Sequence, residues 1–283
     1  MVGPWSALRA AHRCDVPRLP LHIDGHVVGS VAQDHLHALT AWPQWLRIDA
    51  CGVDLLAPRP LRDAALAQIH AALREQRLIV AWRDETYAIV TEHGAPPLAL
   101  IERAASRFWG TLTFGAHCNG YLADADGRPT HLWIARRAAH KATDPGKLDN
   151  LVGGGVPHGQ TPFEALLREG FEEAGLDEAT MRGAQPAGVI ALACDITEGF
   201  MNEHLHAFDL HLPAHLTPVN QDGEVAELNC LPVAEAIECA AAGEMTVDAA
   251  LVTLDFALRH RLLVDPMHAA LLAGRLAPLL VAR

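Results

Sequence analysis

The segment 153–176 constrains this chain most, because a run of three glycines leads into a short helix whose two ends are both marked. Thr161 is a good N-cap, Pro162 suits the first helical position, and Glu164 completes a Thr-x-x-Glu capping box. Gly175 is a natural residue just beyond a helix C-terminus. We therefore predict a helix that begins at Pro162 and ends before Gly175, preceded by a flexible glycine loop.

Three glutamates share one side of this predicted helix. Glu169, Glu172 and Glu173 are three and four residues apart, and this spacing places side chains on the same face. Nothing within the triad neutralises the repulsion between the carboxylates, so the arrangement favours a bound cation. Mg²⁺ and other hard divalent ions prefer oxygen ligands. The alternative is a solvated acidic face, which is common on helices; the neighbouring glycines favour the metal site.

The composition bounds the class of protein. The chain has 283 residues, enough for one large domain or two ordinary ones, and half of them are hydrophobic. The net charge of −12 argues against broad binding to nucleic acid or to an anionic membrane. Six scattered cysteines without a C-x-x-C pair are typical of a reduced compartment. Because we find neither a signal peptide nor an apolar stretch near the ~20 residues of a membrane span, we expect a soluble cytoplasmic protein.

Residues 17–90 have the pattern of a small α+β unit. Two short apolar runs flank the dipeptide Asp24-Gly25, a recognised hairpin signal. The segment 61–77 repeats apolar residues at helical spacing, and the run 78–82 is typical of a strand.

The pattern changes near residue 110, where we place a soft boundary. We predict a small α+β N-terminal domain over 1–110 and an α/β sandwich with a mixed sheet over 111–283. In the second part, apolar runs indicate strands near 120–122, 132–135, 189–192 and 205–212, and helices are expected at 162–174, 233–242 and 248–263.

The glycines and the acidic helix together match a known motif. Gly154, five residues, Gln160, seven residues and then the segment 168–176 closely resemble the Nudix box, G-x5-E-x7-R-E-U-x-E-E-x-G-U, where U is bulky and aliphatic. Two positions depart from it. Gln160 replaces the usual glutamate, which weakens its expected link to Arg168. Gly170 stands at the first U position, where glycine costs up to ~1 kcal/mol in a helix and allows closer packing.

The resemblance extends to one subfamily and implies an α/β/α sandwich. Its members carry a domain of unknown function before the Nudix domain, and in fungi they are found fused to thiamine pyrophosphokinase. The resemblance implies hydrolysis of a small-molecule diphosphate, with diphosphates of oxidised thiamine converted to monophosphate and phosphate. The segments that carry the similarity are His131–Arg137, Lys141, Asp144–Asn150, Phe114–Tyr121, Asp222–Val225 and Leu251–His260.

The resemblance also implies roles for the box residues. Glu169, Glu172 and Glu173 would bind one or more Mg²⁺ or Mn²⁺ ions, helped by the carbonyl of Gly154. All three glutamates are candidate catalytic residues, and Glu169 is our first choice as the base toward an attacking water.

A later acidic residue often contributes in Nudix enzymes. Glu224 is our candidate for it, with Glu203 and Asp222 behind it, and an ordinary turn carboxylate is the equally weighted alternative. A basic cluster precedes the glycines and is expected to bind substrate phosphate, unless it is only a solvated strand end. Its members are Arg136, Arg137, Lys141 and Lys147.

Two other functions stay open beside the hydrolase. One is a non-catalytic Nudix-type module that senses a diphosphate ligand, although all three box glutamates remain in this chain. The other is a Nudix-fold isomerase of isoprenoid diphosphates, for which Cys118 or Cys194 would have to serve in catalysis. The N-terminal part could shape specificity or mediate homodimer formation, and the sequence does not decide between these roles.

Overall fold

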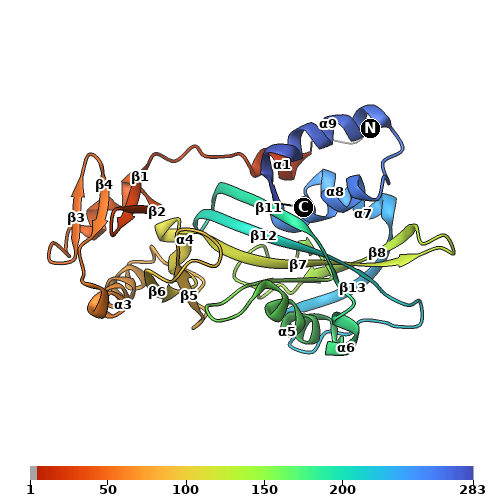
Figure 1. The fold of residues 1–283 in the computed structure, drawn as a ribbon, viewed down its shortest axis with the longest axis horizontal. Helices are drawn as coiled ribbons and strands as arrows, with labels where there is room; N and C mark the ends of the chain where they lie inside the picture. Colours follow the sequence, from red (N-terminus) through yellow and green to blue (C-terminus); the bar gives the residue numbers. More distant parts are fainter. Residues whose placement is uncertain (1–4, 283) are drawn as a thin grey trace.

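The N-terminal part of the chain forms a small sheet with its own core (Figure 1). The computed structural model describes residues 5–282. The strands of this sheet are β1 (Arg18–Ile23), β2 (His26–Ala32), β3 (Leu46–Asp49) and β4 (Gly52–Leu55), in the order β2-β1-β4-β3. Asp24 and Gly25 both have positive φ in the turn between β1 and β2, which confirms the predicted hairpin.

Helix α3 (Arg59–Glu75) supplies an apolar stripe to the N-terminal core. Leu66, Ile69 and Leu73 are buried, and their spacing of three and four residues puts them on one face of the helix. The helix predicted over 61–77 is therefore confirmed.

The segment 78–82, which we predicted to be a strand, is an irregular loop instead. Arg77 and Ala81 each have a φ of 59°, a left-handed conformation that cannot continue an extended strand. The strand comes later, as β5 (Thr86–Ile89), and it pairs with β6 (Ala99–Glu102) in a separate hairpin. The apolar run 78–82 is therefore a loop that precedes β5 in the sequence, and the prediction of a strand there was wrong.

An eight-stranded mixed sheet forms the centre of the C-terminal part (Figure 1). Its strands are β7 (Thr113–Ala123), β8 (Pro129–Arg137), β9 (Leu148–Asp149), β10 (Val152–Gly155), β11 (Gln185–Ile196), β12 (Gly199–His211), β13 (Val225–Pro232) and β14 (Leu280–Ala282). The order is β13-β8-β7-β12-β11-β14, while β9 pairs with β8 and β10 with β7. Only β7 and β12 run parallel among these pairs of described strands.

Helices cover both faces of this sheet, which confirms the predicted α/β/α sandwich (Figure 1). One face carries α5 (Pro162–Ala174) and α6 (Glu178–Met181), and the other carries α1 (Ser6–Ala10), α7 (Val233–Ala242), α8 (Val247–Arg259) and α9 (Pro266–Leu276). Each face has its own apolar core. The remaining short helices are η1 (Gln33–His35), α2 (Leu36–Leu39), α4 (Ala105–Trp109) and η2 (Ala277–Leu279).

Helix α1 belongs to the N-terminal end of the sequence but packs against the C-terminal part of the structure. Trp5 and Leu8 are buried in the core formed with α7, α8 and the large sheet. The segment 12–17 then leads across to β1 (Figure 1). We keep the boundary near residue 110 as a proposal, with α1 on the C-terminal side of the division. No helix within residues 5–282 is both long and apolar enough to cross a membrane.

Candidate active site

The helix that carries the three glutamates, α5, is closed at both ends by its own sequence. The hydroxyl of Thr161 accepts a hydrogen bond from the backbone N–H of Glu164 at 3.2 Å, and the Glu164 carboxylate accepts one from the N–H of Thr161 at 2.7 Å. Gly175, with a φ of 63°, ends the helix in the left-handed conformation. The start and the end of α5 are therefore as predicted, while Ala165, Leu166 and Ala174 pack into the core and leave the acidic face on another side of the helix.

The arginine of the box is paired within α5. Arg168 lies 2.9 Å from Glu169 and 2.9 Å from Glu172, one guanidinium nitrogen to each carboxylate. Among the described residues, no hydrogen bond joins Arg168 to Gln160. With glutamine at position 160, Arg168 therefore pairs with Glu169 and Glu172.

The second departure from the box motif has a packing reason. A Cβ at Gly170 would lie 2.6 Å from the sulfur of Met181, the buried residue that ends α6. A bulky aliphatic side chain at this position would require the Met181 side chain to move away from α5. Glycine therefore lets α6 approach α5, at a cost of up to about 1 kcal/mol in helix propensity.

The three glycines before the helix form strand β10 and not the flexible loop that we predicted. They pair with β7 in an antiparallel ladder, where Gly154 lies opposite Ala116. Their missing side chains alternate between two faces, as in any strand. A Cβ at Gly154 would lie 2.3 Å from the Glu169 carboxylate, and one at Gly155 would lie 3.0 Å from the guanidinium carbon of Arg103. The backbone of β10 alone therefore separates Glu169 of the acidic helix from Arg103.

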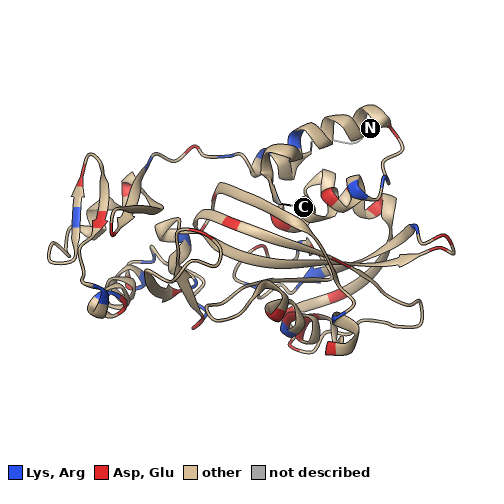
Figure 2. Ribbon diagram, in the orientation of Figure 1, with Lys and Arg blue, Asp and Glu red and all other residues tan. Residues whose placement is uncertain are grey.

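Buried negative charge accumulates on α5, where Figure 2 shows acidic residues recurring along the helix. Glu173 is only 6% exposed and accepts a hydrogen bond from the N–H of Gly153 at 2.9 Å. Burial, together with the charges of Glu169 and Asp149, raises the pKa of Glu173 to about 8. Burial also raises the pKa of Glu169, against the opposing effect of Arg168. A cation bound here would offset the cost of these buried charges.

The donor chemistry of this cluster suits a hard divalent ion, but the side chains are not gathered into a finished cage. Within residues 5–282, no group of three or more His, Cys, Asp or Glu side chains is arranged to hold a metal ion. The Glu169 carboxylate, which packs against the backbone of Gly154, and the buried carboxylate of Glu173 are both oxygen donors that fit such an ion. Glu169 and Glu172 each contact Arg168 through one carboxylate oxygen, and the second oxygen of each would be the one to bind an ion.

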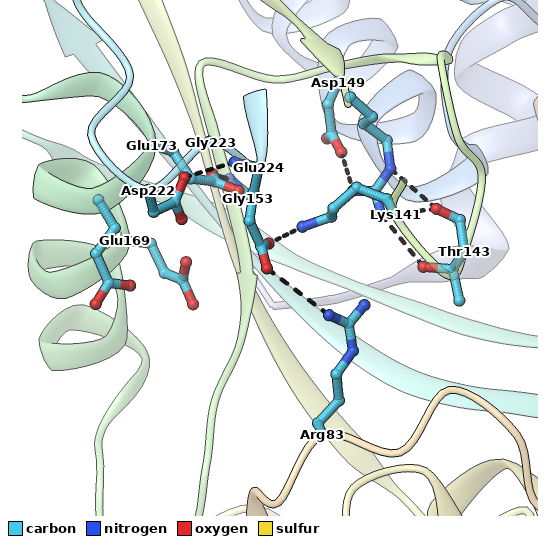
Figure 3. Close-up of polar contacts among 12 residues, drawn as sticks. Arg83, Lys141, Thr143, Asp149, Gly153, Glu169, Glu173, Asp222, Gly223 and Glu224 are labelled. Carbon is cyan, nitrogen blue, oxygen red and sulfur yellow. Dashed lines mark hydrogen bonds and ion pairs between the residues drawn. The ribbon is translucent and has the colours of Figure 1, made fainter. Parts of the chain in front are cut away.

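Glu224, our candidate for the additional acid, is held by two cations (Figure 3). The largely buried amino group of Lys141 makes a close ion pair with its carboxylate, and Arg83 approaches it at 3.7 Å. The side chain of Asp222 accepts a hydrogen bond from the N–H of Glu224 at 2.8 Å. In Figure 3, Glu224 lies between Glu169 on one side and Arg83 on the other.

A cavity of about 580 Å³ lies against β10 and contains part of the predicted basic cluster. Arg137 lines it and donates to Asp149 at 2.9 Å, and Lys147 lines it with an ion pair to Asp144 at 2.9 Å. Lys141 is not among the lining residues because it is committed to Glu224.

The fourth member of the basic cluster is placed elsewhere. Arg136 is half exposed and pairs with Glu227 of β13 at 3.3 Å, so it does not line the cavity. Adjacent residues of a strand point to opposite faces, and Arg137 therefore takes the inward position that Arg136 cannot.

Several cavity residues were not predicted from the sequence. Arg83, Arg103 and Arg107 come from the N-terminal part of the chain. No motif connects these arginines to the box, since only the packing of β5, β6 and α4 beside β10 brings them there. The carboxylate of Glu203, named above only as a reserve, accepts a hydrogen bond from Arg107 at 2.6 Å. The other lining residues that carry charge or can titrate are Arg13, His117, Cys194, Asp195, Glu198 and Asp248.

Comparison with known protein families agrees with the box on α5. A model of the NUDIX domain matches residues 115–253. The chain carries a Nudix domain. In front of it, residues 7–113 match a domain of unknown function, DUF4743.

Proteins similar to this chain include two Nudix hydrolases of Arabidopsis thaliana. Nudix hydrolase 24, chloroplastic, is 36% identical over 203 residues, which are 71% of this chain and 55% of that protein. Nudix hydrolase 20, chloroplastic, is 36% identical over 200 residues, which are 70% of this chain and 53% of that protein. An uncharacterized protein of Saccharomyces cerevisiae is 30% identical over 194 residues, 64% of this chain and 56% of its own length. The chain thus spans about half the length of these relatives, and the Nudix domain and its DUF4743 neighbour are what it shares with known families.

Proposed function

We propose that this Nudix chain is a metal-dependent hydrolase of an organic diphosphate, which it converts to a monophosphate and phosphate. The observation that carries the proposal is that α5 retains all three box glutamates beside an arginine-lined cavity. Water attack on a diphosphate is opposed by dense negative charge, so catalysis is mainly charge neutralisation and positioning. The acidic helix and the arginines of the cavity offer the two kinds of group that this requires.

The residues of α5 have distinct proposed roles. Glu169, Glu172, Glu173 and the Gly154 carbonyl would hold Mg²⁺ or Mn²⁺, which when bound supplies positive charge at the phosphate oxygens. Glu169 would accept the proton of the attacking water. Burial raises the pKa of Glu169, and a carboxylate with a raised pKa is a stronger base than an exposed one.

Glu224 remains our candidate for an additional catalytic acid or base. Its carboxylate contacts Lys141 and Arg83 in this structure, so it can take a proton only after exchanging one of these contacts. Of the predicted basic cluster, Arg137 and Lys147 line the cavity, which supports the proposal that they bind substrate phosphate.

We further propose diphosphates of oxidised thiamine as the substrate class. The support is the similarity of several segments to the subfamily described above. A panel of organic diphosphates that includes oxidised thiamine diphosphates, with products identified by mass, tests this assignment separately from the reaction type. Hydrolysis of other diphosphates alone would reject the substrate and leave the reaction class standing.

The isomerase alternative has little support from the site. Both cysteines that it would need are buried, and burial raises the pKa of Cys118 and raises that of Cys194 to about 11. Neither thiol is therefore ionised near neutral pH. The non-catalytic sensing module is separated from the hydrolase by a simple assay, since only the hydrolase releases phosphate in the presence of Mg²⁺ and stops when a chelator is added.

Replacing Glu173 by Gln tests the metal-ligand role of the box. We expect diphosphate hydrolysis to fall by about 100-fold or more, because a group that stabilises developing charge is worth this much. Glu178→Gln on α6 is the matched control, since Glu178 is exposed and paired only with Arg182 among the described residues. Calorimetry should show weaker Mg²⁺ uptake for the Glu173 variant and unchanged uptake for the control. Near-normal turnover by Glu173→Gln would reject the ligand assignment.

A further inference from the structure

We propose that the N-terminal DUF4743 part supplies arginines that bind the diphosphate of the substrate: Arg83, Arg103 and Arg107. This inference rests on the proposed function, because it assigns the partner of the substrate's phosphates in the same site. Arg83 lies in the loop before β5, Arg103 in the turn after β6, and Arg107 on α4. All three line the cavity against β10.

Arg103 is held directly against the glycine strand. The absent side chain of Gly155 makes room for it, since a Cβ there would lie 3.0 Å from the Arg103 guanidinium carbon and 1.8 Å from the hydroxyl oxygen of Tyr87. One nitrogen of Arg103 donates to Glu85 at 2.8 Å, and its guanidinium carbon lies 5.6 Å from the centre of the Tyr87 ring. These contacts orient the guanidinium. Its other nitrogens make no hydrogen bond within residues 5–282, and they are left to a ligand in the cavity.

Arg107 has a buried nitrogen that needs an acceptor. One guanidinium nitrogen donates to Glu203 at 2.6 Å. The other terminal nitrogen is buried and has no hydrogen-bond partner in the part of the chain that the structure describes. A buried donor without an acceptor is costly, and nearly all such groups in folded proteins are satisfied. Because Arg107 lines the cavity, a small movement of its side chain would bring this nitrogen to a phosphate oxygen there.

Arg83 brings a further positive charge to the same place. Its guanidinium group points toward Glu224 and approaches that carboxylate at 3.7 Å (Figure 3). Burial, followed by the nearby charges of Arg103 and Arg137, lowers the pKa of Arg83. Guanidinium groups from both parts of the chain therefore repel one another around this cavity. Carboxylates such as Glu85 and Asp149 offset part of this repulsion, and a bound phosphate would offset more of it.

The chemistry of the arginines selects the ligand. A guanidinium group presents planar pairs of N–H donors that match the oxygens of a phosphate. Three such groups in one cavity against β10, near an acidic helix suited to a divalent ion, fit a polyanion with several phosphate oxygens. The N-terminal part would then complete the substrate site that the Nudix domain begins.

Binding of methylenediphosphonate, a diphosphate analogue that cannot be hydrolysed, tests the inference on the full chain. We expect Arg103→Met and Arg107→Met each to weaken binding about 10-fold to 100-fold in calorimetry, because each removes a charge-assisted hydrogen bond. Arg47→Met is the matched control. Arg47 is an exposed arginine of β3 that pairs with Asp54 at 3.1 Å, far from the cavity lining, and its loss should leave binding unchanged.

Glu85→Gln separates ligand binding from a structural role. This variant breaks the Glu85–Arg103 ion pair as Arg103→Met does, but it keeps the arginine in place. We expect Glu85→Gln to bind the analogue as tightly as the wild type or more tightly. Binding as weak as that of Arg103→Met would show that only the ion pair matters and would overturn the inference.

The remaining outcomes distinguish this inference from the proposed function. Thermal unfolding of each variant checks that it is folded. If the wild type binds the analogue through Arg103 but hydrolyses no diphosphate, the hydrolase proposal fails and the inference stands. If the wild type hydrolyses diphosphates while Arg103→Met and Arg107→Met keep its KM and its affinity for the analogue, the inference fails alone. A wild type that does not bind the analogue with or without Mg²⁺ also overturns it.

Discussion

At the scale of single residues, Gly155 decides how closely the two parts of the chain can meet. The hydroxyl of Tyr87 and the guanidinium of Arg103 lie where its side chain would be. Gly154 has the same relation to Glu169 on the other face of β10. Glycine is needed at both positions because of close approach and not because of an unusual backbone angle, since both residues belong to a strand.

Gly155→Ala should therefore destabilise the full chain by about 1–3 kcal/mol, the usual cost of adding a carbon to a packed region. Tyr87→Phe removes the nearest atom, so the double variant should regain part of the loss. Urea unfolding measures both values. Gly274→Ala is the control, because a Cβ at Gly274 meets nothing within 4 Å. A double variant no more stable than Gly155→Ala would show that the hydroxyl is not the obstacle.

At the scale of elements, α3 and α4 are joined by a buried hydrogen bond between two rings. Trp109 of α4 donates from its indole nitrogen to His70 of α3 at 2.8 Å. Both residues are almost fully buried in the N-terminal core. The histidine must be neutral to accept this bond, and burial lowers the pKa of His70 to about 3.

This arrangement predicts a loss of stability on acidification. The unfolded chain protonates His70 below about pH 6.5, whereas the folded chain does so only near pH 3. The contribution is therefore present above pH 6.5 and is lost as the pH falls toward 3. Between pH 7 and pH 5 the free energy of unfolding should drop by about 2 kcal/mol more than in a His70→Gln variant, whose amide can still accept from Trp109. Urea unfolding at the two pH values compares them, and equal losses would contradict the assignment.

At the scale of the whole molecule, the segment 12–17 ties the two parts together over one side of the cavity. The carboxylate of Asp195 on β11 accepts hydrogen bonds from the N–H groups of Asp15 at 2.6 Å and Val16 at 2.9 Å. Arg13 and Asp195 both line the cavity. The Asp195 side chain thus holds this segment together with backbone contacts, since the N–H of Asp195 also donates to the carbonyl of Arg13 at 2.7 Å.

Asp195→Ala should release this segment and speed tryptic cleavage after Arg13 and Arg18, because proteases require a chain that can leave the surface. Asp124→Ala is a matched control. The Asp124 carboxylate also accepts two backbone N–H groups, at 3.0 and 2.9 Å, but it does so within the turn between β7 and β8. Cleavage after Arg13 and Arg18 at the wild-type rate in Asp195→Ala would refute this role.

Part of this architecture was predictable because its causes are local. The capping box of Thr161, the helix stop at Gly175 and the Asp24-Gly25 turn depend on residues only a few positions apart. The sandwich followed from apolar runs that alternate with helical periods. The loop over 78–82 and the strand at β10 were missed, since one depends on left-handed residues such as Ala81 and the other on pairing with the distant β7.

The sequence by itself determined α5, its acidic face and the metal chemistry that we propose for it, since neighbouring residues along one helix are sufficient to create all three. Only the tertiary structure decided which basic groups face that helix. It turned Arg136 outward, committed Lys141 to Glu224, and brought Arg103 from the N-terminal part to β10. The physical reason is that charges on separate segments become neighbours only through packing, and no spacing rule along the chain encodes that contact.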